Sequence, residues 1–199
     1  MLGWRLRRRG MHLTVVYFVR HAESDHTVID ELTRPLTIKG KKDAKELVGH
    51  FDSISIDSIY SSPYLRAIST IKPIADKKNI KINIRDNLKE RLSNSSWIHN
   101  QMDLETFVDR MWFDTKTSVD GGETIAELKK RNISELTSIL NESNNRTIII
   151  GTHGTALASI ISNYECAFTG KDFMKFINVM PYIVKMMFKG QDLLKIDRK

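Results

Sequence analysis

Two histidines in this sequence each follow an apolar run that is typical of a buried strand. Arg20-His21 comes after the run 12–19, and His153 comes after the run 147–152. The carboxyl ends of parallel strands meet at one sheet edge, so the two imidazoles can face one crevice. An imidazole beside an arginine suits nucleophilic attack or the binding of an anion. A lone histidine at a strand end is more often a hydrogen-bonded structural residue, and it is the pair that favours a site.

Further groups suited to an anion are expected at the same edge. The helix predicted to begin at Gly154 would add backbone N–H donors and the positive end of its dipole. Arg66 falls one turn into the helix predicted after the strand 56–62, so its side chain can lean back over the sheet edge. We therefore expect two imidazoles and two guanidinium groups to surround one anion.

The elements that must position these residues follow from the apolar pattern and the turn residues. Strands alternate with helices, which predicts one α/β domain: a three-layer sandwich with a mostly parallel central sheet and helices on both faces. Pro73 should kink or end the second helix. The predicted strands are 12–19, 56–62, 80–85 and 147–152, with a hairpin turning at Lys189-Gly190. The predicted helices are 39–51, 63–79, 103–113 and 122–143, and one from Gly154.

Composition places the chain among ordinary globular proteins and excludes several other classes. Its 199 residues are 41% hydrophobic and 28% charged, which suits one sizeable core, and we expect residues 11–199 to form a single domain. The single cysteine, Cys166, excludes an intramolecular disulfide and any multi-cysteine metal site, so a reducing cytoplasm is the expected location. No segment is long and apolar enough to predict a transmembrane helix.

The net charge of +7 is concentrated at one end of the chain. Four of the 31 basic residues lie within 1–10, which leaves the rest of the chain at about +3. We interpret residues 1–10 as a flexible basic arm or an upstream extension. Four arginines would give only salt-sensitive, unspecific attachment to nucleic acid, so the pattern does not favour that partner.

The chain resembles the histidine phosphatase superfamily, in its phosphoglycerate-mutase-like branch. The matches occur in the family's order and span the body of the chain. They are RHAES at 20–24 for the Arg-His-Gly signature, PLTIKG at 35–40 for PLTxxG, SSPYLRA at 61–67 with Thr70 for SSPLxRAxxT, Glu90-Arg91 for the acid, GGET at 121–124 for GGES, and GTHG at 151–154 for the second histidine.

The resemblance implies a role for each matched residue. His21 would attack phosphorus and become phosphohistidine, and Glu90 would protonate the leaving oxygen and later activate water. The resemblance assigns catalytic roles to His21, Glu90 and His153, and substrate binding to Arg20, Thr27, Arg66 and Gly154. No metal or cofactor is expected, because guanidinium groups supply the positive charge. The expected partners are a small phosphorylated metabolite and inorganic phosphate as product, without a membrane.

Several features of the sequence depart from the family pattern or keep alternatives open. Ala22 replaces the usual glycine, and Thr27 stands where many relatives have a phosphate-binding asparagine. Without the resemblance Glu90 would be taken for a solvated acid, and Glu23 is the rival proton donor. The mutase's insertion and arginine pair are not evident at 92–120, which favours a metal-independent phosphatase. Phosphoglycerate mutase and a non-catalytic phosphoanion-binding protein remain as alternatives.

Overall fold

The fold is built on one mixed sheet, seen in a computed structural model that describes residues 13–93 and 102–198. The prediction for residues 1–10 falls outside this part. The strand order is β3-β2-β4-β1-β5-β6. The strands are β1 (Leu13–Arg20), β2 (Ser58–Ser61), β3 (Ile82–Ile84), β4 (Thr147–Thr152), β5 (Tyr182–Lys189) and β6 (Asp192–Arg198).

Strands β1, β2, β3 and β4 run parallel, while β5 and β6 form an antiparallel hairpin at one edge. The register pairs Arg20 at the end of β1 with Thr152 at the end of β4. The backbone N–H of His21 donates to the Thr152 carbonyl over 3.0 Å. The two predicted histidine segments therefore leave the sheet side by side.

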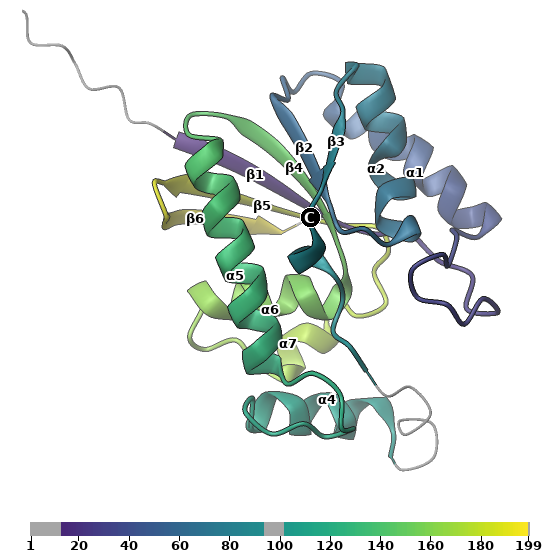
Figure 1. Cartoon of the computed structure of the whole chain (residues 1–199), viewed down its shortest axis with the longest axis vertical. Helices are drawn as coiled ribbons and strands as arrows, with labels where there is room; N and C mark the ends of the chain where they lie inside the picture. Colours follow the sequence, from purple (N-terminus) through teal and green to yellow (C-terminus); the bar gives the residue numbers. More distant parts are fainter. Residues whose placement is uncertain (1–12, 94–101, 199) are drawn as a thin grey trace, which may run out of the picture.

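Helices cover both faces of the sheet (Figure 1), which confirms the predicted α/β layered class. One face carries α1 (Ile38–Phe51) and α2 (Leu65–Lys78). The opposite face carries α5 (Ile125–Glu142) and α6 (Gly154–Tyr164), with the short 3₁₀ turn η1 (Asp86–Leu88) beside α5. Helices α4 (Leu104–Phe113) and α7 (Gly170–Met174) pack against each other below α6 in the view of Figure 1. None of the described helices is long and apolar enough to cross a bilayer.

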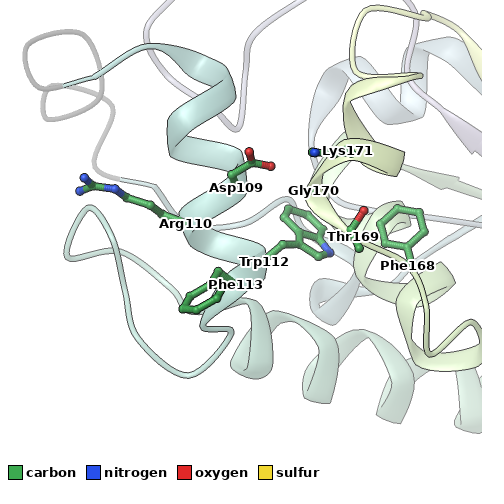
Figure 2. A pocket seen from close by; sticks show the side chains of 8 residues that line it. All are labelled: Asp109, Arg110, Trp112, Phe113, Phe168, Thr169, Gly170 and Lys171. Carbon is green, nitrogen blue, oxygen red and sulfur yellow. The ribbon is translucent and has the colours of Figure 1, made fainter.

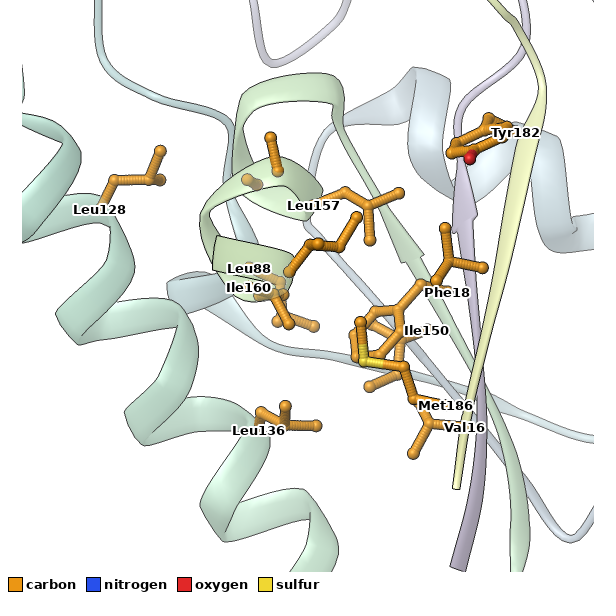
Figure 3. Close-up of a cluster of buried hydrophobic side chains, with 14 of the residues drawn as sticks. Val16, Phe18, Leu88, Leu128, Leu136, Ile150, Leu157, Ile160, Tyr182 and Met186 are labelled. Atoms are coloured by element: carbon orange, nitrogen blue, oxygen red, sulfur yellow. The ribbon is translucent and has the colours of Figure 1, made fainter. Parts of the chain in front are cut away.

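Alternate residues of β1 build two separate cores. Val16 and Phe18 face the α5 and α6 layer, where they join Ile150, Leu136 and Leu157 (Figure 3). Tyr17 and Val19 face α1 and α2 with Phe51, Ile71 and Ile149. Because both faces of β1 and β4 are covered, these strands are apolar almost throughout, as a buried parallel sheet requires.

Local sequence signals explain where the helices begin. Thr37 caps α1 by accepting the Gly40 N–H at 3.0 Å, and Asp103 caps α4 by accepting the Thr106 N–H at 2.9 Å. Thr124 and Glu127 form a reciprocal capping box at the start of α5.

The structure corrects some of the predicted boundaries. Pro73 does not end the second helix, which continues to Lys78 because Ile74 and Ala75 are held in the core beyond the lost backbone hydrogen bond. Pro63 precedes α2, with Tyr64 as its N-cap. Strand β3 is shorter than predicted, and neither η1 nor α7 was expected. Gly190, at φ +61°, makes the predicted hairpin turn between β5 and β6.

Candidate active site

The ends of β1 and β4 bring the two predicted histidines into contact. The ring centroids of His21 and His153 are 5.3 Å apart, with the planes at 61°. The ring of Tyr64, from the N-cap of α2, lies 5.1 Å from that of His153. Both imidazoles are buried, so the sheet edge forms a compact site rather than an exposed rim.

The hydrogen bonds of His21 show which ring nitrogen can act as a nucleophile. Nδ1 lies 2.7 Å from the Ala22 carbonyl oxygen, which can only accept, so Nδ1 carries the proton. Nε2 then holds the lone pair, and Arg66 Nε donates to it over 3.3 Å. Burial and then the charge of Arg66 lower the pKa of His21 to about 3. The imidazole is therefore neutral near pH 7, as nucleophilic attack requires.

The ring of His153 is held by a contact with Ser62. Its Nε2 lies 2.7 Å from Ser62 Oγ, which also accepts the Tyr64 N–H at 3.3 Å. Burial and then the Arg66 charge keep the pKa of His153 well below its ordinary value. Its Nδ1 is buried and has no hydrogen-bond partner among the described residues. In the tautomer with its proton on Nδ1, with Nε2 accepting the Ser62 hydroxyl, this nitrogen would have an N–H to donate.

Arg20 is anchored behind the site by backbone carbonyls. Its Nη1 donates to the carbonyls of Phe176, Ile177 and Val179 at 2.9, 2.7 and 3.3 Å. The guanidinium lies against Gly154, where a Cβ atom would come within 3.2 Å of Cζ and Nη2. Its Nε is buried and has no partner among the described residues, which makes it a second donor available to an anion. Burial lowers the pKa of Arg20, and the nearby Glu90 charge opposes that shift.

Arg66 is oriented by a residue that sequence reasoning missed. Nη1 donates to the Glu31 carbonyl and Nη2 to Glu31 Oε2, each over 2.8 Å, while Nε remains directed at His21. Arg34 also pairs with the Glu31 carboxylate at 2.5 Å. Burial lowers the pKa of Arg66, and Glu31 partly offsets it. Glu31 lies in a charged loop without regular spacing, so the sequence carried no signal for it.

The structure distinguishes the two candidate proton donors. Glu90 follows η1 in the chain, and its side chain reaches the N-terminus of α6. There its carboxylate accepts the N–H groups of Thr155 and Ala156 at 2.9 and 3.0 Å. The Glu23 carboxylate instead accepts the Thr37 hydroxyl at 2.7 Å, beside the cap of α1. Glu90 lines the same pocket as Arg20 and Gly154. Of the two carboxylates, only Glu90 lines this pocket.

Other motif residues hold these segments in place. Thr70 accepts the Ala22 N–H at 2.9 Å and so fixes the backbone after His21. A side chain at Gly40 would place Cβ 2.1 Å from the Glu23 carbonyl oxygen, which explains the glycine that ends the PLTxxG motif.

A partly buried clamp fixes the backbone of the acid segment. Glu123 binds Arg131 at 2.6 Å, and Arg131 donates to the carbonyls of Asn87, Lys89 and Glu90 at 2.7 to 2.9 Å. The motif GGET therefore positions Glu90 through an arginine on α5, a role that the spacing alone does not reveal.

Thr27 is not brought to the other site residues. It is exposed, and its hydroxyl donates to Asp25 within its own loop at 2.7 Å. Its part in phosphate binding stays a prediction without a supporting contact among the described residues. In the same described part of the chain, no group of three or more His, Cys, Asp or Glu side chains is arranged to hold a metal ion.

Two hollows flank α4. The smaller, of about 210 Å³, is lined by Arg20, Glu90, Gly154 and Thr155, so it adjoins the residue before His21 and the residue after His153. The larger, of about 680 Å³, lies between α4 and the start of α7 (Figure 2). Neither Arg20 nor Glu90 lines it, and its walls include Trp112 and Phe168. The smaller hollow is therefore the one placed to receive a leaving group.

The groups of this site, taken together, are suited to the transfer of a phosphoryl group to Nε2 of His21. It offers a neutral nucleophile, buried cations and unpaired N–H donors, and a carboxylate at a helix N-terminus. Because the positive charge comes from guanidinium groups, the residues themselves can neutralise phosphoryl oxygens.

Comparison of the whole sequence gives the same class of protein. A sequence profile for the histidine phosphatase superfamily (branch 1) matches residues 16–179. The chain is 29% identical over 168 residues to phosphoserine phosphatase 1 of Hydrogenobacter thermophilus, covering 79% of this chain and 77% of that protein. It is 28% identical over 157 residues to a probable phosphoglycerate mutase of Salmonella choleraesuis, covering 74% and 73%.

Solved structures share the fold at lower sequence identity. A mycobacterial glucosyl-3-phosphoglycerate phosphatase superposes with a TM-score of 0.74 at 13% identity, over 94% of this chain and 97% of the other. A phosphoserine phosphatase mutant from Entamoeba histolytica, solved with phosphoserine, gives a TM-score of 0.71 at 21% identity, over 92% and 96%. These similarities support the fold assignment.

Proposed function

The chain belongs to branch 1 of the histidine phosphatase superfamily, and we propose that it hydrolyses a small phosphomonoester without a metal, through a phosphohistidine on His21. The observation that carries this proposal is the state of His21. Its Nε2 lone pair faces Arg66 in a buried pocket, and its pKa of about 3 keeps the ring neutral.

The first step transfers the phosphoryl group to the protein. Nε2 of His21 forms a bond to phosphorus while the bond from phosphorus to the alcohol oxygen breaks. Arg20, Arg66 and the Nδ1 hydrogen of His153 bind the phosphoryl oxygens, where negative charge is greatest. Glu90, in its protonated form, gives its proton to the departing alcohol.

The second step returns the protein to its starting state. Water attacks phosphorus, the bond to Nε2 breaks, and inorganic phosphate leaves. Glu90 takes a proton from the attacking water, so it is again protonated for the next cycle. The helix N-terminus at Thr155 and Ala156 holds this carboxylate in place during both steps.

We also propose that residues 11–199 act as one histidine-phosphatase-like domain in the cytoplasm. The profile match over 16–179 and the continuous sheet support the domain boundaries. The exposed, unpaired Cys166 supports a reducing compartment.

Phosphate release by the purified protein tests the proposal. The wild-type protein should release phosphate from an aryl phosphate in the presence of EDTA, and His21→Ala should abolish release. His50→Ala makes the same chemical change on α1, away from the sheet edge, and should retain activity. EDTA-sensitive activity that survives in His21→Ala would reject the proposal. Interconversion of phosphoglycerate isomers faster than phosphate release would favour a mutase instead.

A further inference from the structure

The hollow of about 210 Å³ beside Glu90 has two chemically different sides. One side carries the groups of the phosphate site, Arg20, Glu90 and the α6 N-terminus. The other side is contributed by α4, α7 and the segment after it, and it is apolar. Its apolar lining residues are Leu104, Phe107, Val108, Met111, Phe173 and Ile177.

The arginines that line this hollow are already paired. Arg91 is buried and forms two hydrogen bonds with the Asp120 carboxylate, at 3.0 and 2.5 Å, and a third with the Glu123 carbonyl at 2.7 Å. Arg20 donates through Nη1 to three backbone carbonyls, and its other nitrogens lie against Gly154; its unpaired Nε is the donor that the proposed function gives to the phosphoryl group.

Two further arginines near the site, which do not line the hollow, are also paired. Arg131 pairs with Glu123, and Arg66 pairs with Glu31. With Arg20 bound to the phosphoryl group, a carboxylate on the leaving group would therefore enter the hollow without a further unpaired cation among the described lining residues to compensate its lost hydration.

We propose that this hollow binds an uncharged, apolar leaving group, so that the preferred substrate is the phosphate ester of a small alcohol without a carboxylate. This inference rests on the proposed phosphatase function and narrows its substrate class. A volume of about 210 Å³ is below that of pockets for drug-sized ligands, so the alcohol is small. Its apolar body would lie against Phe107 and Met111, with its ester oxygen toward Glu90.

A matched pair of esters tests the charge of the leaving group. 4-Methylpentyl phosphate and 4-phosphooxybutanoate have the same chain length and shape, and differ in a terminal isopropyl group or carboxylate. Both are unactivated alkyl esters, so leaving-group reactivity differs little. We expect kcat/KM to be at least tenfold higher for the 4-methylpentyl ester.

A lysine placed in the hollow should change this preference. Leu104 lines the hollow and is 47% exposed, so Leu104→Lys is compatible with folding. It should reduce the ratio of the two kcat/KM values at least fivefold and leave inhibition by inorganic phosphate unchanged. Leu194→Lys is the control, because Leu194 is 52% exposed on β6, does not line the hollow, and should leave the ratio unchanged.

The outcomes separate this inference from the function on which it rests. Equal or higher kcat/KM for the carboxylate ester would overturn the inference while leaving the phosphatase intact. The same holds if both lysine variants change the ratio equally, or if an aryl phosphate is hydrolysed but neither alkyl ester is. Failure to hydrolyse even the aryl phosphate would overturn the proposed function and the inference together.

Discussion

Gly154→Ala is the substitution that most directly tests the placement of Arg20. A Cβ atom at this position would lie 3.2 Å from Cζ and Nη2 of Arg20 and 3.3 Å from Nε. Contacts this short require the neighbour to move by a few tenths of an ångström. Arg20 resists that movement, because its Nη1 is hydrogen-bonded to three backbone carbonyls in the segment after α7.

The expected loss follows from the sensitivity of catalysis to position. A displacement of about 1 Å can cost about 100-fold in rate, so a few tenths of an ångström should cost about 4- to 10-fold in kcat/KM. This corresponds to about 0.8 to 1.4 kcal/mol of transition-state stabilisation. The free energy of unfolding should fall by about 0 to 2.5 kcal/mol, since overpacking costs about 1 to 3 kcal/mol and alanine in a helix recovers about 0.5 to 1 kcal/mol.

Both effects can be measured on one preparation: kcat/KM from the hydrolysis of an aryl phosphate, and the free energy of unfolding from urea unfolding. Gly49→Ala is the matched control, because Gly49 is in α1 and has nothing within 4 Å of the added Cβ. It should raise the free energy of unfolding by about 0.5 to 1 kcal/mol without changing kcat/KM. Unchanged kcat/KM in Gly154→Ala would refute the claim that Arg20 requires a glycine against it.

Three further perturbations test other parts of the site. The unfolded chain protonates histidine below about pH 6.5, while buried His21 stays neutral down to about pH 3. The free energy of unfolding should therefore decrease as the pH is lowered through that window, by up to about 1.4 kcal/mol per pH unit for this residue, and His21→Gln should remove its share. A slope that His21→Gln leaves unchanged would contradict this. Asp120→Ala leaves Arg91 buried without its carboxylate partner, so the free energy of unfolding measured in urea should fall by about 3 to 5 kcal/mol. A decrease of less than about 1 kcal/mol would contradict this. Glu31→Ala should lower kcat/KM about tenfold by releasing Arg66, and stronger inhibition by inorganic phosphate would instead show that Glu31 competes with the anion.

The sequence was informative wherever local patterns decide structure. Apolar runs ending in Arg20-His21 and in His153 predicted that both histidines would leave the sheet at one edge, and the register of β1 against β4 confirms it. Capping residues such as Thr124 marked helix starts. These signals work because strand burial and helix capping depend on residues close together in the chain.

Contacts between distant segments could not be predicted in the same way. The Glu31 carboxylate reaches Arg66 across 35 positions, and Arg131 holds the backbone of the acid segment from another helix. Pro73 was expected to kink or end its helix, but packing of the residues that follow outweighed one missing hydrogen bond. Such outcomes depend on tertiary contacts, which single-residue preferences do not encode.

The phosphoenzyme itself is the most direct test of the central claim. Wild-type protein mixed with an aryl phosphate and quenched in alkali should carry a phosphoryl group on one residue, which peptide mass spectrometry can locate. The tautomer of His21 predicts attachment at its Nε2, with formation fast enough to account for turnover. A phosphoryl group on another residue, or turnover without any phosphorylated protein, would contradict the account.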